Sequence, residues 1–165
     1  MADDYAQALV VLRETPPTLG PLVVALSPDV LRRRPSPDGW SPLEVIDHIR
    51  NVDEVISARV SRMLEEERPL LGPASPPGPP VGDPATALAL WQAARKANLE
   101  WLSGLTEEQL ARAGTHSRYG ELTVREHVIE WAYHDLDHIR QIFAAIQAGL
   151  YPAIGPFRAL YPPPA

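Results

Sequence analysis

Hydrophobic residues recur at helical spacing from Thr123 to Gln147, a segment without glycine or proline. On a helical wheel they form one apolar stripe, which predicts a long helix with one buried face. The stripe consists of Val124, Val128, Trp131, Ile142 and Ile146, with Ile139 beside it. Four polar residues follow one margin of this stripe, within about 60° of one another: His127, His134, His138 and Gln141.

A second long helix is predicted from Ser41 to about Glu67. Ser41, Pro42 and Glu44 combine an N-cap, a proline at the first helical position and a capping box. The predicted buried stripe contains Val45, Ile49, Val52, Ile56, Val60 and Met63. His48 lies at the margin of this stripe, as His134 and His138 do on the other helix.

Shorter patterns predict the remaining helices. Residues 3–14 are predicted to form a helix capped by Asp3 or Asp4. Pro16 and Pro17 are expected to interrupt it, and residues 18–26 to resume it as a kinked continuation. Ser27 and Pro28 start a short helical turn, and a capping box at Thr106 starts another that reaches about Ala113. Between these two turns, Asp83 and Pro84 open a helix through Leu102, with buried positions at Leu88, Trp91, Ala94 or Arg95, and Leu99 or Leu102.

The segment from Arg68 to Pro84 holds seven prolines and three glycines, so we expect a loop rather than a helix or a strand. Residues 114–122 are predicted to be a second loop, and the chain after Gly149 is expected to be irregular. No segment has a convincing strand pattern. Four long helices therefore predict an all-α protein, a four-helix bundle in which residues 1–165 form one domain.

Charge, hydrophobicity and cysteine content limit the classes of function that this chain can have. The formal charge is −6 and Lys96 is the single lysine, which argues against a nucleic-acid surface. No apolar run is long enough to cross a membrane and the N-terminus is acidic, so we expect a cytoplasmic protein. The chain has no cysteine, and any metal site must therefore use histidine and carboxylate ligands.

His134 and His138 are four residues apart, which places both imidazoles on one side of a helix and within reach of one metal ion. A lone histidine at such a margin is more often a core residue with a satisfied hydrogen bond. Two further signatures are absent, because Asp135 replaces the glutamate of His-Glu-x-x-His and no pair of Glu-x-x-His motifs occurs. The pair needs a third ligand, and His48 is the candidate.

The same residues resemble the DinB-like superfamily. Gly39-Trp40-Ser41-Pro42, followed by His48, is similar to the start of the family motif. The run from Gly120 to Glu126, leading to His134-Asp135-Leu136-Asp137-His138-Ile139-Arg140-Gln141, is similar to its C-terminal signature. This resemblance implies a four-helix bundle with up-down-down-up topology that is often dimeric. It also implies that His48, His134 and His138 bind one divalent metal ion, and it assigns no such role to His127 or His116.

The family includes metal-dependent thiol S-transferases and isomerases that use small thiols, and other members described as hydrolases. The resemblance therefore implies a divalent transition metal, with zinc, nickel, iron and manganese not distinguished, and a low-molecular-weight thiol as a further cofactor. The function expected here is a metal-dependent hydrolase or thiol transferase acting on a small molecule. The alternative is a non-catalytic bundle in which the ion only joins two helices or the pocket only binds a ligand.

Four residues are candidates for catalysis. Glu130, one turn before His134, is the first candidate to orient a ligand ring, whereas Asp47 and Asp137 are interpreted as surface residues. The loop residues His116, Arg118 and Tyr119 are candidates for the rim of the substrate entrance.

Two further expectations concern the role of His127 and the oligomeric state of the protein. His127 lies roughly 10.5 Å from His134 along the helix axis, too far to share its ion, so it is expected to pack in the bundle or to donate a hydrogen bond. A homodimer is expected because Trp91 and Trp101 offer more apolar surface than one bundle core needs.

Overall fold

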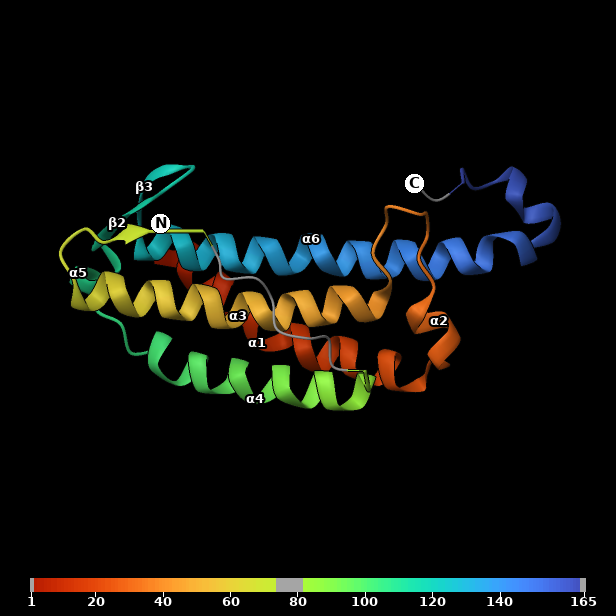
Figure 1. Cartoon of the computed structure of the whole chain (residues 1–165), viewed down its shortest axis with the longest axis horizontal. Helices are drawn as coiled ribbons and strands as arrows, with labels where there is room; N and C mark the ends of the chain where they lie inside the picture. Colours follow the sequence, from red (N-terminus) through yellow and green to blue (C-terminus); the bar gives the residue numbers. More distant parts are fainter. Residues whose placement is uncertain (1, 74–81, 164–165) are drawn as a thin grey trace.

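The structure is a computed structural model that describes residues 2–73 and 82–163. Within these residues, four long helices make a bundle: α1 (Ala2–Ala25), α3 (Pro42–Glu65), α4 (Pro84–Leu102) and α6 (Val124–Leu150). Helices α1 and α3 each pack against both α4 and α6 (Figure 1). Figure 1 also shows that α1 and α6 run in one direction along the long axis, and α3 and α4 in the other. The predicted bundle is confirmed.

Side-chain caps fix where the helices begin. Ser41 and Glu44 form the predicted capping box of α3, and Asp83 accepts a hydrogen bond from the Thr86 amide at the start of α4. Thr106 caps the short helix α5 (Glu107–Leu110), and Thr123 forms a further capping box with Glu126 at the start of α6. Each cap satisfies backbone N–H groups that have no partner inside the helix. Helix α3 ends two residues before the predicted Glu67, and α5 ends before the predicted Ala113.

Helix α1 continues without a break through Pro16, Pro17 and Pro21, so the predicted interruption at Pro16 and Pro17 was wrong. A proline has no N–H, so Pro16 leaves the carbonyl of Leu12 without its usual helical donor. The buried guanidinium of Arg95 on α4 replaces that donor, with Nη1 2.8 Å from the Leu12 oxygen. The chain then turns through α2 (Pro28–Arg32), which begins at the predicted Ser27 cap.

A small sheet corrects the all-α prediction. Strand β1 (Leu70–Leu71) pairs in parallel with β2 (Ala113–His116), which pairs antiparallel with β3 (Gly120–Thr123). Except for Ala113 and Thr123, these strand residues lie in the two segments predicted to be loops. Strands of two to four residues are too short to show an alternating pattern. Gly114 is needed for close packing, since a Cβ there would lie 3.0 Å from Met63 Cγ. Gly120 adopts a φ of +84°, which most residues avoid.

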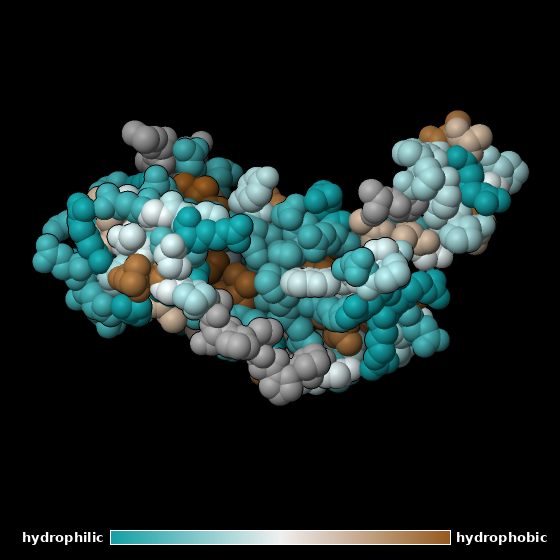
Figure 2. All heavy atoms as spheres, turned by 45° about the horizontal axis from the view of Figure 1, so that its top comes forward, coloured by the Kyte–Doolittle hydropathy of each residue, from teal (hydrophilic) through white to brown (hydrophobic). Residues whose placement is uncertain are grey.

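Residues 74–81, the centre of the predicted proline-rich loop, lie outside the described residues. At the other end of the chain the prediction of an irregular tail was wrong. Two 3₁₀ helices, η1 (Tyr151–Ala153) and η2 (Gly155–Ala159), follow α6. Figure 2 shows this C-terminal part projecting from one end of the molecule, with hydrophobic residues at its tip.

The core has two apolar clusters. One gathers around Leu12, Val60, Met63 and Trp131, and the other around Leu19, Ile46, Trp91 and Ile142. Asp53, Arg95 and Asp135 are also buried. None of the described helices has an apolar stretch sufficient to span a membrane.

Candidate metal centre

Three imidazoles from two helices meet at one point. His48 lies two turns into α3, and His134 and His138 occupy successive turns of α6. The Nε2 atom of His134 is 3.2 Å from Nε2 of His48 and 3.0 Å from Nε2 of His138. One ligand atom from each of the three residues lies within 4.8 Å of the others. The structure therefore brings together the three histidines singled out in the sequence.

The hydrogen bonds of His138 indicate which nitrogen is free. Its Nδ1 is 2.9 Å from Oε1 of Gln141, one turn later on α6. An amide oxygen only accepts hydrogen bonds, so Nδ1 carries the proton and Nε2 has a lone pair directed at the other two rings. Gln141 lies on the histidine margin predicted from the sequence, where it had no predicted role.

This arrangement fits a metal ion. Metal–nitrogen bonds of about 2.0–2.1 Å at tetrahedral angles place ligand nitrogens about 3.3 Å apart, close to the two measured separations. Three lone pairs directed at one point repel one another unless a cation or a proton lies between them. Burial lowers the pKa of both His48 and His134 to about 4, with further contributions from the neighbouring histidines. Both rings are therefore neutral at pH 7, the form that binds a metal.

Trp40 covers one side of the group. Its ring stacks on His138 with centroids 5.9 Å apart and meets the edge of His48 at 4.8 Å. Trp40 is 43% exposed, so it separates the imidazoles from solvent without being part of the core. Since Ser41 starts α3 directly after Trp40, the cap of the helix also fixes this tryptophan beside His48.

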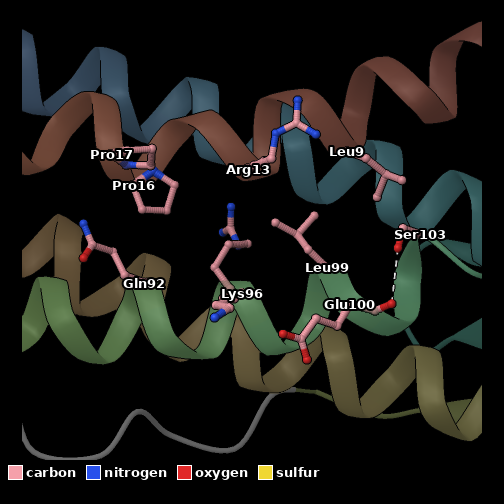
Figure 3. A pocket seen from close by; sticks show the side chains of 10 residues that line it. Leu9, Arg13, Pro16, Pro17, Gln92, Lys96, Leu99, Glu100 and Ser103 are labelled. Atoms are coloured by element: carbon pink, nitrogen blue, oxygen red, sulfur yellow. Dashed lines mark hydrogen bonds between the residues drawn. The ribbon is translucent and has the colours of Figure 1, made fainter.

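A hollow of about 460 Å³ opens beside His138. Its walls come from the loop before α3 and from α6, and they include Pro35, Ser36, Asp38, Gly39, Trp40, His138, Arg140, Gln141 and Ala144. A larger groove of about 620 Å³ runs between α1 and α4, lined by Leu9, Pro16 and Leu99 among others (Figure 3). None of the five histidines lines that groove. The hollow at Trp40 is therefore the better candidate for a substrate site.

The candidate rim residues lie elsewhere. His116 ends β2, and Arg118 and Tyr119 form the turn to β3. Nδ1 of His116 accepts hydrogen bonds from the backbone amides of Arg118 and Tyr119, and the rings of His116 and Tyr119 stack at 4.8 Å. None of the three lines the hollow at Trp40. Their contacts are mainly with one another, which stabilises the turn.

His127 is buried on α6, separate from the three-histidine group. Its Nδ1 lies 3.4 Å from Oε2 of Glu130. The bond to His127 lowers the pKa of Glu130, and electrostatic interaction with His134 and Arg59 adds to this effect. Glu130 has a 55% exposed side chain and is therefore an ionised carboxylate between His127 and His134 at the helix surface.

The interpretation of Asp47 as a surface residue was wrong. Asp47 is 5% exposed and its Oδ1 lies 3.7 Å from Nε of Arg50. Its side chain is therefore buried rather than exposed. Asp137 pairs with Arg140 at 3.0 Å and is half-exposed, in agreement with a surface position.

A buried ionic cluster that was not predicted from the sequence lies next to the histidines. Arg95 on α4 binds both Asp53 on α3 and Asp135 on α6. Burial raises the pKa of Asp135 to about 6 and also raises that of Asp53, while the shared guanidinium opposes the change. Two features of the sequence indicated this cluster. Arg95 was one of two alternatives for a buried position, and Asp135 interrupts a series of apolar residues on α6.

Solved structures with a similar fold were found. One similar solved structure is described as "YfiT from Bacillus subtilis is a probable metal-dependent hydrolase with an unusual four-helix bundle topology". It has 23% sequence identity and a TM-score of 0.78, and the alignment covers 86% of this chain and 85% of that chain. A second, TT2238, is described as a four-helix bundle protein, with 21% identity and a TM-score of 0.63 over 87% of this chain and 99% of that chain. At these identities the likeness shows the fold alone.

A search of curated proteins found no match. The model of the DinB superfamily, in contrast, matches residues 12–142, a range that contains all three histidines of the group. The chain belongs to the DinB superfamily.

Proposed function

We propose that His48, His134 and His138 bind one divalent transition-metal ion and that the protein is a metal-dependent hydrolase acting on a small molecule. The observation that carries this proposal is the convergence of three Nε2 atoms beside a solvent-accessible hollow. The description of YfiT as a probable metal-dependent hydrolase supports the same proposed function.

The donor set favours a transition metal over calcium or magnesium, which prefer oxygen ligands. Zinc, nickel, iron and manganese all accept imidazole, and these donors do not distinguish among them. Within the described residues, no further histidine or carboxylate joins the three ligands. An incomplete set of protein ligands is typical of catalytic sites, whereas structural sites are closed by four. This difference favours an enzyme over an ion that only joins two helices.

Protein side chains would prepare the site for hydrolysis. If a metal ion is bound by these three neutral imidazoles, it would polarise a substrate oxygen and would lower the pKa of bound water toward neutrality. Gln141 holds His138 in the tautomer with a free Nε2, and Trp40 limits the access of solvent to His48 and His138. Glu130 is ionised at neutral pH and lies one turn from His134, so it is our candidate for accepting a proton. Arg140, at the rim of the hollow, could attract an anionic group of the substrate.

The thiol cofactor implied by the family resemblance remains a prediction. The described lining of the hollow is a mixture of aromatic, proline and polar residues, and none of them is specific for a thiol. We therefore rank hydrolysis above thiol transfer. A thiol would have to occupy the same open side of the three histidines, so both activities would depend on the same ligands.

The test is a hydrolysis screen with protein purified without a polyhistidine tag and loaded separately with zinc, nickel, iron(II) and manganese. Ester, amide and phosphodiester substrates would be assayed with and without low-molecular-weight thiols. We expect activity that depends on the metal, is lost in His138→Ala and persists in His127→Gln. A metal-loaded protein that turns over none of these substrates, with thiol or without, would contradict the assignment as a hydrolase.

A further inference from the structure

The side chain of Arg95 lies at the centre of the bundle and is 1% exposed. Nε and Nη2 donate to the two carboxylate oxygens of Asp53, at 2.9 and 2.6 Å. Nη1 and Nη2 donate to the carboxylate of Asp135, at 2.7 and 3.2 Å. Nη1 also donates to the Leu12 carbonyl at 2.8 Å. Arg95 therefore contacts all four long helices, and its five N–H groups have five acceptors.

The two carboxylates come from the helices that carry the histidines. Asp53 is on α3, five residues after His48, and Asp135 is on α6, directly after His134. Nε1 of Trp131 on α6 also donates to Asp53 Oδ1, at 2.9 Å. The rings of Trp91 and Trp131 lie 5.4 and 5.3 Å from the guanidinium carbon. Helices α3 and α6 are thus joined, close to the three imidazoles, through one rigid planar group.

Stability alone does not explain this cluster. Removing charges from water is costly, and an apolar residue of similar size often replaces a buried ion pair without loss of stability. A guanidinium that forms two-point bonds to two carboxylates does, however, fix distance and rotation more closely than apolar contacts do. The distance that most needs to be fixed in this protein is the one between His48 on α3 and His134 on α6. Their Nε2 atoms are 3.2 Å apart.

We propose that Arg95 is a positioning residue of the metal centre. By binding Asp53 and Asp135 together, it sets the spacing and rotation of α3 and α6, and so keeps His48 in register with His134 and His138. This inference rests on the proposed function, because it assumes that the three histidines bind a metal.

The test compares Zn²⁺ affinity in Arg95→Lys and in a matched control, Leu88→Ala. Lysine keeps the positive charge and the apolar stem but cannot bind two carboxylates through a planar fork. Leu88 is buried on the same helix, seven residues earlier, and belongs to an apolar cluster without a bond to the ionic group. Affinities would be measured by chelator competition at a temperature where circular dichroism shows both variants to be folded.

We expect Zn²⁺ to bind about tenfold or more weakly to Arg95→Lys, as for other residues that orient metal ligands, and nearly unchanged to Leu88→Ala. If Arg95→Lys does not fold, Asp53→Asn and Asp135→Asn would be tested in the same way, and each should weaken Zn²⁺ binding. Wild-type affinity in the folded charge variants, or an equal loss in Leu88→Ala, would overturn the inference. Wild-type protein that takes up no Zn²⁺ would instead overturn the proposed metal site, and this inference with it.

Discussion

Among single residues, His134 and His127 differ in their partners, although both lie on the same side of α6. His134 Nε2 contacts two other imidazoles, whereas His127 pairs with Glu130. We therefore predict that His134→Ala loses the bound metal and that His127→Gln keeps it. The metal-to-protein ratio, measured by mass spectrometry of untagged protein, checks this. Equal loss in both variants would show that His127 is a ligand.

Stability of the metal-free protein should depend on pH through His134. Its pKa is about 4 in the folded protein, against about 6.5 in the unfolded chain. Between these values the unfolded chain binds more protons, so the free energy of unfolding falls as the pH falls from about 6.5 to 4. From pH 7 to pH 5, wild type should lose about 1–2 kcal/mol more than His134→Gln, allowing for partial exposure of the ring. Urea unfolding at the two pH values measures this difference, and identical losses would contradict it.

The grouping of the three histidines was easier to predict from the sequence than the burial and hydrogen bonds of the residues around them. The four-residue spacing of His134 and His138 was sufficient to predict that their imidazoles lie together. The position of His48 beside the apolar stripe of the second long helix made it the candidate for the third ligand. Asp53 and Asp135 were not recognised, because their burial depends on Arg95, forty or more positions away, and wheel analysis treats each helix alone. Gln141 was placed correctly on the histidine margin, but its bond to His138 depends on a side-chain rotamer.

At the scale of elements, the start of α3 determines where His48 and Trp40 lie. The Ser41 hydroxyl accepts from the Glu44 amide, and the Glu44 carboxylate accepts from the Ser41 amide at 2.8 Å. We predict that Ser41→Ala lowers the free energy of unfolding by about 0.5–2 kcal/mol, the usual cost of losing an N-cap. Ser61→Ala, at an exposed position inside the same helix, is the control and should change it little. Equal stabilities of the two variants in urea would contradict this prediction.

Most helix starts were predicted well and short strands were not, although α1 begins at Ala2, before the Asp3 or Asp4 predicted to cap it. A cap is a local signal of three or four residues, and Ser27, Ser41, Asp83 and Thr106 all cap helices as expected. Strand β1, in contrast, exists only because β2 lies beside it, and β2 comes more than forty residues later. The 3₁₀ turns after α6 also have no side-chain cap that the sequence could reveal.

At the scale of the whole molecule, the stated reason for a homodimer was wrong. Trp91 is fully buried and Trp101 packs against the core, so both belong to their own bundle. Exposed apolar surface occurs instead in the C-terminal part, where Phe157 and Leu160 are 64% and 72% exposed. A homodimer therefore remains a prediction on different grounds.

Light scattering should report a mass of about 36 kDa, twice the 18.2 kDa of one chain. The double variant Phe157→Ser/Leu160→Ser should report one chain, because it removes apolar surface without changing the core. A wild-type mass near 18.2 kDa at micromolar concentration would rule out the dimer.

A crystal of metal-loaded, untagged protein would show whether His48, His134 and His138 bind one metal ion. Diffraction data collected on both sides of the absorption edge of the metal locate the ion independently of any assumed ligands. We predict one strong anomalous peak per chain, with a nitrogen of each of the three histidines about 2.0–2.3 Å away. An ion bound elsewhere, or side chains of these three residues directed to separate parts of the surface, would rule out the three-histidine metal site.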